Sequence, residues 1–179
     1  MDFDSEEWRA ERDRKLSEWI GDPHAEAWFL NYCEVCEIVD DFYDADVSLE
    51  RPKRQDMVAR LLNAALIEMP ISSFFQKWKE GLVPLIIAGV NAWLDANEAE
   101  AKVQDPNRPW GGDMTALQHA FVLREQYMEV LAFIIYLKRG FPYLREHSAE
   151  IRAFFHHHET FEDYAEKFGV PKPVPGSDT

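Results

Sequence analysis

One stretch near the start of the chain, Asn31–Asp46 with the sequence NYCEVCEIVDDFYDAD, combines acidic and apolar side chains in a helical period. At about 100° per residue, one helix face collects apolar residues, namely Trp28, Tyr32, Val35, Val39 and Phe42. The opposite face collects Glu34, Glu37, Asp41 and Asp44, with Asp40 at the boundary. The pattern predicts an amphipathic helix from His24 to about Asp46, packed on one side and charged on the other.

The rest of the chain repeats this helical period and contains no series of strands. We expect further helices at 5–20, 55–69, 82–102, 114–139 and 143–168, the last broken near Thr160. Pro70 and Gly81 are expected to end or interrupt helices. Residues 82–94 are apolar almost all round, which predicts the most buried helix. The pattern therefore predicts an all-α fold, a single-domain bundle of about six helices.

Length and composition agree with one helical domain over 1–168, in which 1–22 forms a peripheral N-terminal helix. Hydrophobic residues make up 46% of the chain, and this content argues against disorder. The segment 169–179 is rich in Pro, so we expect a flexible tail there.

The formal net charge of −14 narrows the classes of partner. A sequence-independent binder of phosphate backbones needs a basic surface, so no nucleic acid is expected. No apolar run reaches the roughly eighteen residues that cross a membrane, so no membrane partner is expected either. The start, MDFDSEEWRAERDRK, lacks the apolar core of a signal peptide, which predicts a cytoplasmic protein. The charge suits a metal-dependent enzyme, a soluble acidic protein or a binder of a basic partner.

The only two cysteines, Cys33 and Cys36, lie within the predicted helix in a CxxC arrangement. In a reducing cytosol we interpret them as small residues at the edge of the core. The alternative is a zinc site shared with His156 or His158, because two cysteines and two histidines form an allowed tetrahedral set. The run His156–His158 otherwise indicates a polar surface, since three consecutive helical side chains point in three directions.

The acidic string DDFYD supplies the first candidate for metal binding, through Asp40, Asp41 and Asp44. Its carboxylates fall on adjacent turns, and hard oxygen ligands of this kind suit Mg²⁺ or Mn²⁺. The alternative is a solvated helix face without function, because most of these acids point away from the apolar side.

A second group of polar residues lies on the apolar helix, where Asn91, Asp95 and Glu98 share one face. They either bind metal or emerge into solvent near the end of the helix. Arg124 lies among apolar residues at helical spacing, where a guanidinium needs a carboxylate or a phosphate as partner. If the two acidic helices face one another, a metal can bridge them to a diphosphate, with Arg124 as the phosphate-binding residue.

Several segments resemble a family of uncharacterised phage-encoded helical proteins. These segments are LIEMPISSFFQKW, LVPLIIAGVNAW, AFVLREQYMEV and EIRAFFHHHETF, together with DDFYD. The resemblance covers most of the chain from His24 to Tyr164. It implies a phage origin, and therefore the cytoplasm of a host cell.

DDFYD followed by NAWLDANEAE is similar to the two metal-binding motifs of class I isoprenoid (terpene) synthases. That family is all-α and uses Mg²⁺ to ionise an allylic diphosphate. The resemblance implies metal binding by Asp40, Asp41, Asp44, Asn91 and Asp95. The final Glu of the second motif falls at Ala99. Glu34-x-x-Glu37 and Asp95-x-x-Glu98 also resemble the all-α nucleotide pyrophosphohydrolases, which bind Mg²⁺ between facing helices.

Three functions follow from these observations. The first is a Mg²⁺-dependent enzyme that acts on a diphosphate. The second is a non-enzymatic, acidic accessory protein that binds a host or virion protein, with Trp8, Trp19 and Trp110 as candidate exposed anchors. The third is a structural or oligomeric bundle with an interface at Phe74, Phe75 and Trp78. Neither the substrate, the partner nor the oligomeric state follows from the sequence.

Overall fold

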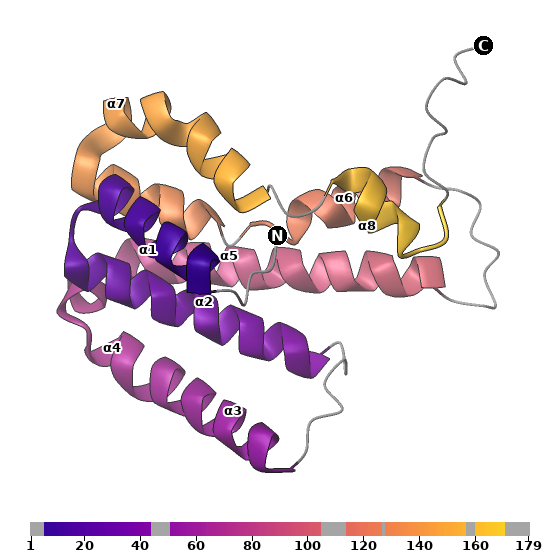
Figure 1. Ribbon diagram of the computed structural model, residues 1–179, viewed down its shortest axis with the longest axis horizontal. Helices are drawn as coiled ribbons and strands as arrows, with labels where there is room; N and C mark the ends of the chain where they lie inside the picture. The colour runs from indigo at the N-terminus through magenta and orange to yellow at the C-terminus, as the bar shows by residue number, and fades with distance from the viewer. Residues whose placement is uncertain (1–5, 44–50, 105–113, 127, 157–159, 171–179) are drawn as a thin grey trace. The chain divides into compact units, whose positions relative to one another are not determined.

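The computed structural model describes residues 6–43, 51–104, 114–126, 128–156 and 160–170, and Figure 1 shows that these ranges are mostly helical. No strand occurs in these ranges, so the predicted all-α fold is confirmed. The elements are α1 (Glu6–Ile20), α2 (Pro23–Tyr43), α3 (Arg51–Asn63), the π-helical turn η1 (Ala64–Glu68), α4 (Met69–Ile71), α5 (Ser73–Gln104), α6 (Met114–Leu123), α7 (Met128–His156) and α8 (Phe161–Glu166).

The described residues form two compact units. The N-terminal unit comprises Asp2–Leu82 together with Ile134–Gly140, and the C-terminal unit comprises Val83–Phe133 together with Phe141–Thr179. Both α5 and α7 therefore contribute residues to each unit. The two units are described separately below.

The N-terminal unit is organised around the turn between α1 and α2. Gly21 has a φ of +64° and its amide donates to the Ser17 carbonyl, so a residue without a Cβ ends α1 here. Asp22 then caps α2, because its Oδ1 accepts from the amides of His24 (2.9 Å) and Ala25 (3.2 Å). The other carboxylate oxygen accepts from Lys138, which a distant part of the chain contributes.

An aromatic cluster fills the space between α2 and the start of α5. The indole of Trp28 stacks on Tyr32 and on Phe75, with ring centroids 5.8 Å and 5.7 Å away. Phe74 packs against the same indole at 5.8 Å in a tilted arrangement. Trp28 and Tyr32 are buried, as the predicted apolar face of α2 requires. Further along that face Val39 and Phe42 are exposed, so the predicted face is buried only over its first half.

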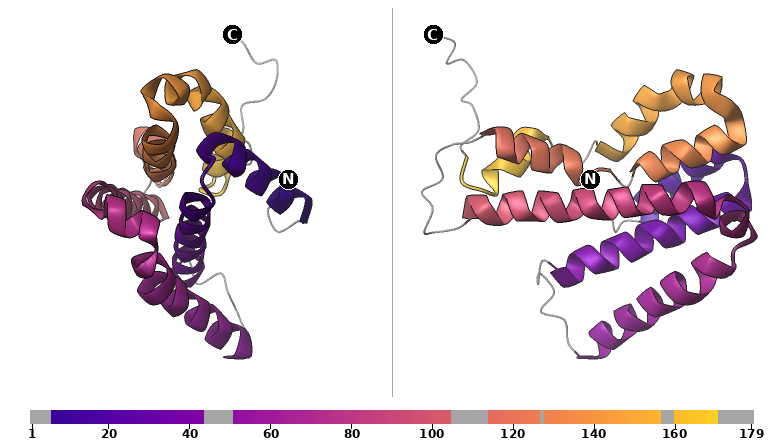
Figure 2. Two further views of the ribbon diagram at one scale, coloured as in Figure 1. Left: turned by 90° about the vertical axis from the view of Figure 1, so that its left-hand side faces the viewer. Right: turned by 180° about the vertical axis from the view of Figure 1, so that it is seen from behind.

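The third predicted helix continues past Pro70 instead of ending there. Helical structure runs from α3 through η1 into α4, and the chain leaves it at Ser72, whose ψ is 128°. Pro70 occupies the first turn of α4, where the missing amide costs no helical hydrogen bond. The segment α3–α4 runs back along α2 in the opposite direction, as Figures 1 and 2 show.

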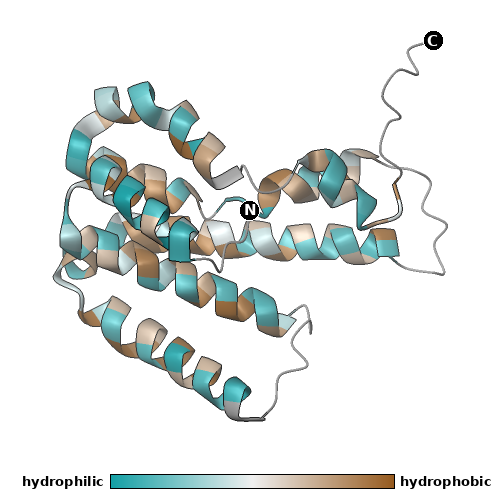
Figure 3. Ribbon diagram, in the orientation of Figure 1, coloured by the Kyte–Doolittle hydropathy of each residue, from teal (hydrophilic) through white to brown (hydrophobic). Residues whose placement is uncertain are grey.

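α5 corrects two expectations. It is continuous from Ser73 to Gln104, so Gly81 does not interrupt it, and Pro84 lies in its interior. The apolar region 82–94 is also not the most buried part of the chain, since several of its large side chains are exposed. Figure 3 shows hydrophobic and hydrophilic residues mixed along this helix. Its buried residues within the C-terminal unit include Ala92, Ala96 and Asn97, and none of them is a large apolar residue.

The predicted long helix over 114–139 is interrupted. α6 ends at Leu123, and residues 124–126 form a turn in which the amides of Glu125 and Gln126 bond three residues back. Gly140, with a φ of +82°, then divides α7 into two helical stretches, as Gly140 and Pro142 predicted. A break near Thr160 is also confirmed, because Thr160 caps α8 through a reciprocal pair of hydrogen bonds with Asp163.

No single described helix is long and apolar enough to cross a membrane. The segments Lys53–Ile71 and Ser73–Gln104, bent by 97°, meet the criteria of length and composition only as a pair.

The first prediction concerns the ion pair between Asp22 and Lys138. The Lys138 ammonium, with the amides of Ala25 and His24, holds the pKa of Asp22 below its ordinary value. A depressed pKa stabilises the fold above the unfolded-state pKa of about 3.9 and loses this contribution as the pH falls through the native value. Asp22→Asn should therefore lower the free energy of unfolding at pH 7 by about 1 kcal/mol, because Asn keeps the cap and loses the charge.

The measurement is urea unfolding of both proteins between pH 7 and pH 2.5. The difference between their free energies of unfolding should become smaller as the pH falls below about 3.9. Glu11→Gln is the matched control, since Glu11 is an exposed carboxylate bonded to Arg14 within the same helix. If the difference in the free energy of unfolding between Asp22→Asn and the unaltered protein stays constant over this pH range, the ion pair between Asp22 and Lys138 does not stabilise the fold.

Candidate functional site

The acidic residues of α2 differ in their position along the helix. Glu34 accepts from Arg60 Nε at 2.7 Å, and this ion pair joins α2 to α3. Asp40 and Asp41 lie beyond it, exposed near the end of α2. Asp44 lies outside the described residues. One of the predicted acids therefore has a structural role, while Asp40 and Asp41 belong to the surface.

Asn91 and Asp95 share one face of α5, as predicted, and both are exposed. Asn91 Nδ2 donates to Asp95 Oδ2 at 3.1 Å, and Glu98 bonds to Lys102 one turn further on. The buried amide of α5 is instead Asn97, whose Nδ2 has no hydrogen-bond partner among the described residues. The helical projection identified the shared face correctly but could not tell which side of α5 is buried.

The predicted metal ligands belong to different units. Asp40 and Asp41 lie in the N-terminal unit, and Asn91 and Asp95 lie in the C-terminal unit. Within the described ranges, no group of three or more His, Cys, Asp or Glu side chains is arranged to hold a metal ion. That the acidic helices face one another and bind Mg²⁺ stays a prediction.

Arg124 lies in the turn after α6, where its guanidinium carbon is 5.0 Å from the centre of the Tyr164 ring. The buried Tyr164 donates its hydroxyl proton to Glu100 Oε1 at 2.6 Å. Phe121 and Phe168 pack on the same ring at 5.2 Å and 5.1 Å. Arg124 is thus placed against an aromatic face, which stabilises a cation. The expected continuous apolar stripe around it is wrong, because the helix breaks at this residue.

Cys33 and Cys36 lie half-buried within α2. Burial raises the pKa of the Cys33 thiol well above its usual range. Burial also raises the pKa of Cys36 to about 11, with nearby Glu37 and Asp40 adding to the effect. Both groups are therefore thiols at neutral pH, as expected for residues at the edge of the core. His158, one suggested zinc partner, lies outside the described residues.

The exposed apolar side chains of the N-terminal unit form a feature that the sequence did not predict. Five of them, here called the α3–α4 face, are 42 to 72% exposed: Val58, Leu62, Leu66, Ile67 and Ile71. The first three follow one another at four-residue intervals along the helix. The last two lie further along the same helical segment, Ile67 within the π-helical turn η1 and Ile71 at the end of α4. The π-turn is what the periodicity of the sequence did not reveal.

The end of α2 presents acidic and apolar groups together. Val39, Phe42 and Tyr43 are exposed there beside Asp40 and Asp41. The tryptophans predicted as exposed anchors are not part of this surface. Trp8 and Trp19 are buried, and Trp110 lies outside the described residues. Of the three aromatic residues proposed as an interface, Phe74 is buried, while Phe75 and Trp78 are half-buried. The exposed large apolar residues of this unit therefore include aliphatic residues on α3–α4 and aromatic residues at the end of α2.

No protein-family model, no curated protein and no solved structure matches this chain. The resemblances to phage-encoded proteins and to isoprenoid synthases stay predictions. Function is therefore inferred from the chemistry of the described surface.

The second prediction concerns the hydroxyl of Tyr164. Tyr164→Phe keeps the ring beneath Arg124 and removes the donor to Glu100. The free energy of unfolding should fall by roughly 1–2 kcal/mol, because a partly buried carboxylate loses a charge-assisted hydrogen bond. Glu100→Gln is the matched control and should cost less, since its amide oxygen still accepts the bond. Equal stability of Tyr164→Phe and the unaltered protein in urea unfolding would show that the bond contributes nothing.

Proposed function

We propose that this chain is a non-enzymatic binding protein that holds a partner protein through the N-terminal unit. The α3–α4 face carries the proposal, because five large apolar side chains are exposed along one helical segment. Contiguous apolar patches on a protein surface mark sites of interaction. An amphipathic helix with such a face binds in an apolar groove of its partner.

The acidic residues of the N-terminal unit indicate which charges the partner should carry around its binding site. The exposed acids Glu37, Asp40 and Asp41 lie on α2, and α3 runs antiparallel to α2 beside it. The whole chain carries a net charge of −14. A partner with an apolar groove and a rim of Lys or Arg is complementary to both features. The resemblance to phage-encoded helical proteins would make this partner a host or virion protein.

The third prediction tests this surface with a defined probe, a synthetic amphipathic helix with Leu on one face and Lys at its edges. Leu66 and Ile71 are the most exposed members of the α3–α4 face, at 68% and 72%. The double variant Leu66→Glu, Ile71→Glu should bind the probe at least tenfold more weakly in fluorescence anisotropy. The unaltered protein should also lose affinity in about 1 M salt, where the Debye length is about 3 Å.

Val122→Glu is the matched control, because Val122 is 63% exposed and lies on α6 of the C-terminal unit. It should leave probe binding unchanged. Circular dichroism checks that each variant keeps its helix content. Equal affinity of the double variant and the control contradicts the proposal, as does binding to lipid vesicles in preference to the probe. Proteins captured from a bacterial lysate should be lost with the same double variant.

The fourth prediction separates this function from a Mg²⁺-dependent diphosphate enzyme. A ligand that binds only the native state at a hundred times its dissociation constant raises stability by about 2.7 kcal/mol. If the chain is a binding protein, adding Mg²⁺ or Mn²⁺ together with pyrophosphate should not change the thermal unfolding midpoint. This should hold for the unaltered protein and for Asp40→Asn. A rise that needs both metal and pyrophosphate, and that disappears in Asp40→Asn, would instead support metal binding by Asp40, Asp41, Asp44, Asn91 and Asp95, with phosphate at Arg124.

A further inference from the structure

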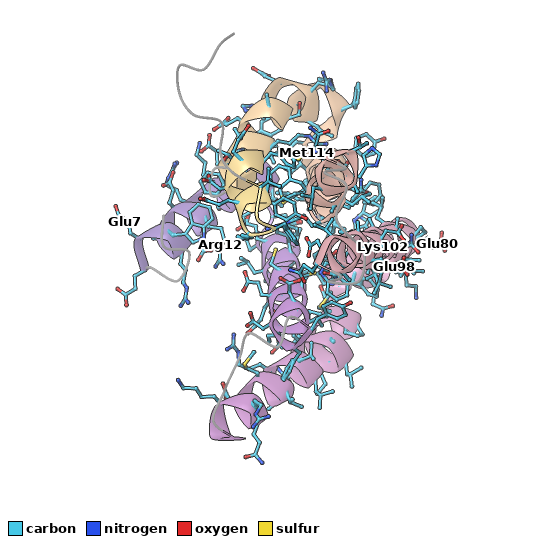
Figure 4. The ribbon with its side chains drawn as sticks, turned by 90° about the vertical axis from the view of Figure 1, so that its right-hand side faces the viewer. Glu7, Arg12, Glu80, Glu98, Lys102 and Met114 are labelled. Carbon is cyan, nitrogen blue, oxygen red and sulfur yellow. The ribbon has the colours of Figure 1, made fainter. Side chains whose placement is uncertain are left out.

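α3 has no fully buried side chain among its described residues. From Lys53 to Asn63 every side chain is exposed or half-buried. The first buried residue of the segment is Ala64, which belongs to η1. Figure 4, which draws the side chains as sticks, shows those of α3 projecting to several sides of the helix. Apolar packing therefore holds η1 in place and contributes much less to holding α3.

A helix of this kind is marginal without further contacts. α3 has 13 residues, and isolated helices shorter than about 12–15 residues are barely stable in water. Segments with few buried apolar contacts also open at the lowest cost in free energy within a folded protein. A polar contact between α3 and α2 should therefore have a large influence on how often α3 is in place.

Arg60 and Glu34 form such a contact. Nε and Nη2 of Arg60 both donate to Glu34 Oε1, the first at 2.7 Å. Asp56 on α3 and Glu37 on α2 also lie within electrostatic range of the guanidinium. Without this cation, carboxylates on the two helices would repel one another. Arg60 therefore bonds α3 to α2 and also reduces the repulsion between them.

The same contact fixes the rotation of α3. At about 100° per residue, the side chains two positions before and after Arg60 lie on nearly the opposite side of the helix. These are Val58 and Leu62, the two members of the α3–α4 face that α3 contributes. Because Arg60 is turned toward Glu34 of α2, both are turned away from α2, and they are 42% and 50% exposed. The ion pair thus docks α3 and presents its part of the face.

The remaining members of the α3–α4 face lie beyond α3, in η1 and α4: Leu66, Ile67 and Ile71. The buried Ala64 holds η1 against its surroundings. In addition, Asn63 Nδ2 donates to Glu68 Oε1 at 2.6 Å across the π-helical turn. The face therefore has one part that packing holds and a second part that depends on Arg60.

We propose that Arg60 is a positioning residue of the partner-binding surface, because through Glu34 it keeps α3 docked on α2 with Val58 and Leu62 presented to the partner protein. This inference rests on the proposed function, since it concerns the same α3–α4 face. When α3 is undocked, the partner has to bind the remaining docked fraction, and the apparent dissociation constant rises in inverse proportion to that fraction. Arg60 in this way controls partner binding without contacting the partner.

The fifth prediction is tested by hydrogen exchange of the full chain without any probe. In Arg60→Gln, the amides of residues 53–63 should exchange about fivefold faster, the upper end of what an exposed ion pair contributes, while the rates in α2 stay the same. Arg14→Gln is the matched control, because Arg14 is 57% exposed, compared with 54% for Arg60, and bonds to Glu11 and Glu18 of its own helix. It should leave α3 unchanged. Equal effects of the two variants on α3, or no effect of Arg60→Gln, overturn the proposal.

The probe-binding assay described above tests the link to the partner. Arg60→Gln makes the surface more acidic, so charge alone would strengthen the binding of a probe with Lys at its edges. Loss of docking predicts the opposite, an affinity that is lower by about twofold or more. Arg60→Lys, which keeps the charge, should recover most of the affinity. If Arg60→Gln binds the probe as tightly as the unaltered protein does, the proposal is wrong.

Glu34→Ala shows whether the two residues act through one contact. It should speed the exchange of α3, and the double variant Glu34→Ala, Arg60→Gln should be no faster than Arg60→Gln alone. Fully additive effects would show that Arg60 does not act through Glu34. If the unaltered protein does not bind the probe at all, the proposed function fails, whereas the exchange rates still decide whether Arg60 docks α3.

Discussion

Asp22 joins parts of the chain that are 116 residues apart. Its carboxylate caps α2 with one oxygen and accepts from Lys138 with the other. Lys138 also lies 5.1 Å from the centre of the Phe74 ring, and the neighbouring Arg139 donates to the Glu18 carbonyl at the end of α1. The short stretch Ile134–Gly140 is in this way fixed to the N-terminal unit by charge as well as by apolar packing. The ammonium group of Lys138 thus lies against Phe74, at one side of the aromatic cluster around Trp28.

The C-terminal unit depends on a comparable arrangement built around Tyr164. A short helix, α8, has too few residues to be stable alone. It is held because Tyr164 is buried among aromatic rings, bonds to Glu100 of α5 and lies against Arg124. In both units, an aromatic ring is in contact with a cation from a distant segment. Polar contacts of this kind specify which helices pack together, a task that apolar burial alone performs less selectively.

The sequence predicted the helices better than their ends or their packing. Apolar periodicity located α1, α2 and the region of α5 correctly, because one-sided burial imposes this period. It missed the break at Arg124, since no Gly or Pro marks that turn, and it placed a break at Gly81, which α5 accommodates. The apolar content of residues 82–94 suggested full burial, although only one side of α5 is covered within its unit. Composition reports how apolar a helix is, whereas burial depends on which neighbours the fold supplies.

In the candidate sites, contacts within one helix were predictable from the sequence, and contacts between separate helices were not. The shared face of Asn91 and Asp95 was predictable, because residues four apart on a helix are neighbours. The partner of Arg124 was not, because Tyr164 comes from a separate helix forty residues along the chain. The exposure of the α3–α4 face escaped prediction, because a sequence shows which residues of a helix are apolar and not which neighbours cover them. The π-turn at Ala64–Glu68 was not predicted either.

The two thiols of α2 have a consequence for the motions of the chain. Cys33 and Cys36 lose their protons only far above neutral pH while α2 stays packed. A thiol reagent attacks the thiolate, so it modifies these residues mainly in molecules whose α2 has opened. The rate of modification then reports how often this helix separates from its surroundings. The two native cysteines therefore report local opening of α2, the helix that carries both acidic surface residues and part of the aromatic cluster, and no cysteine has to be introduced for this purpose.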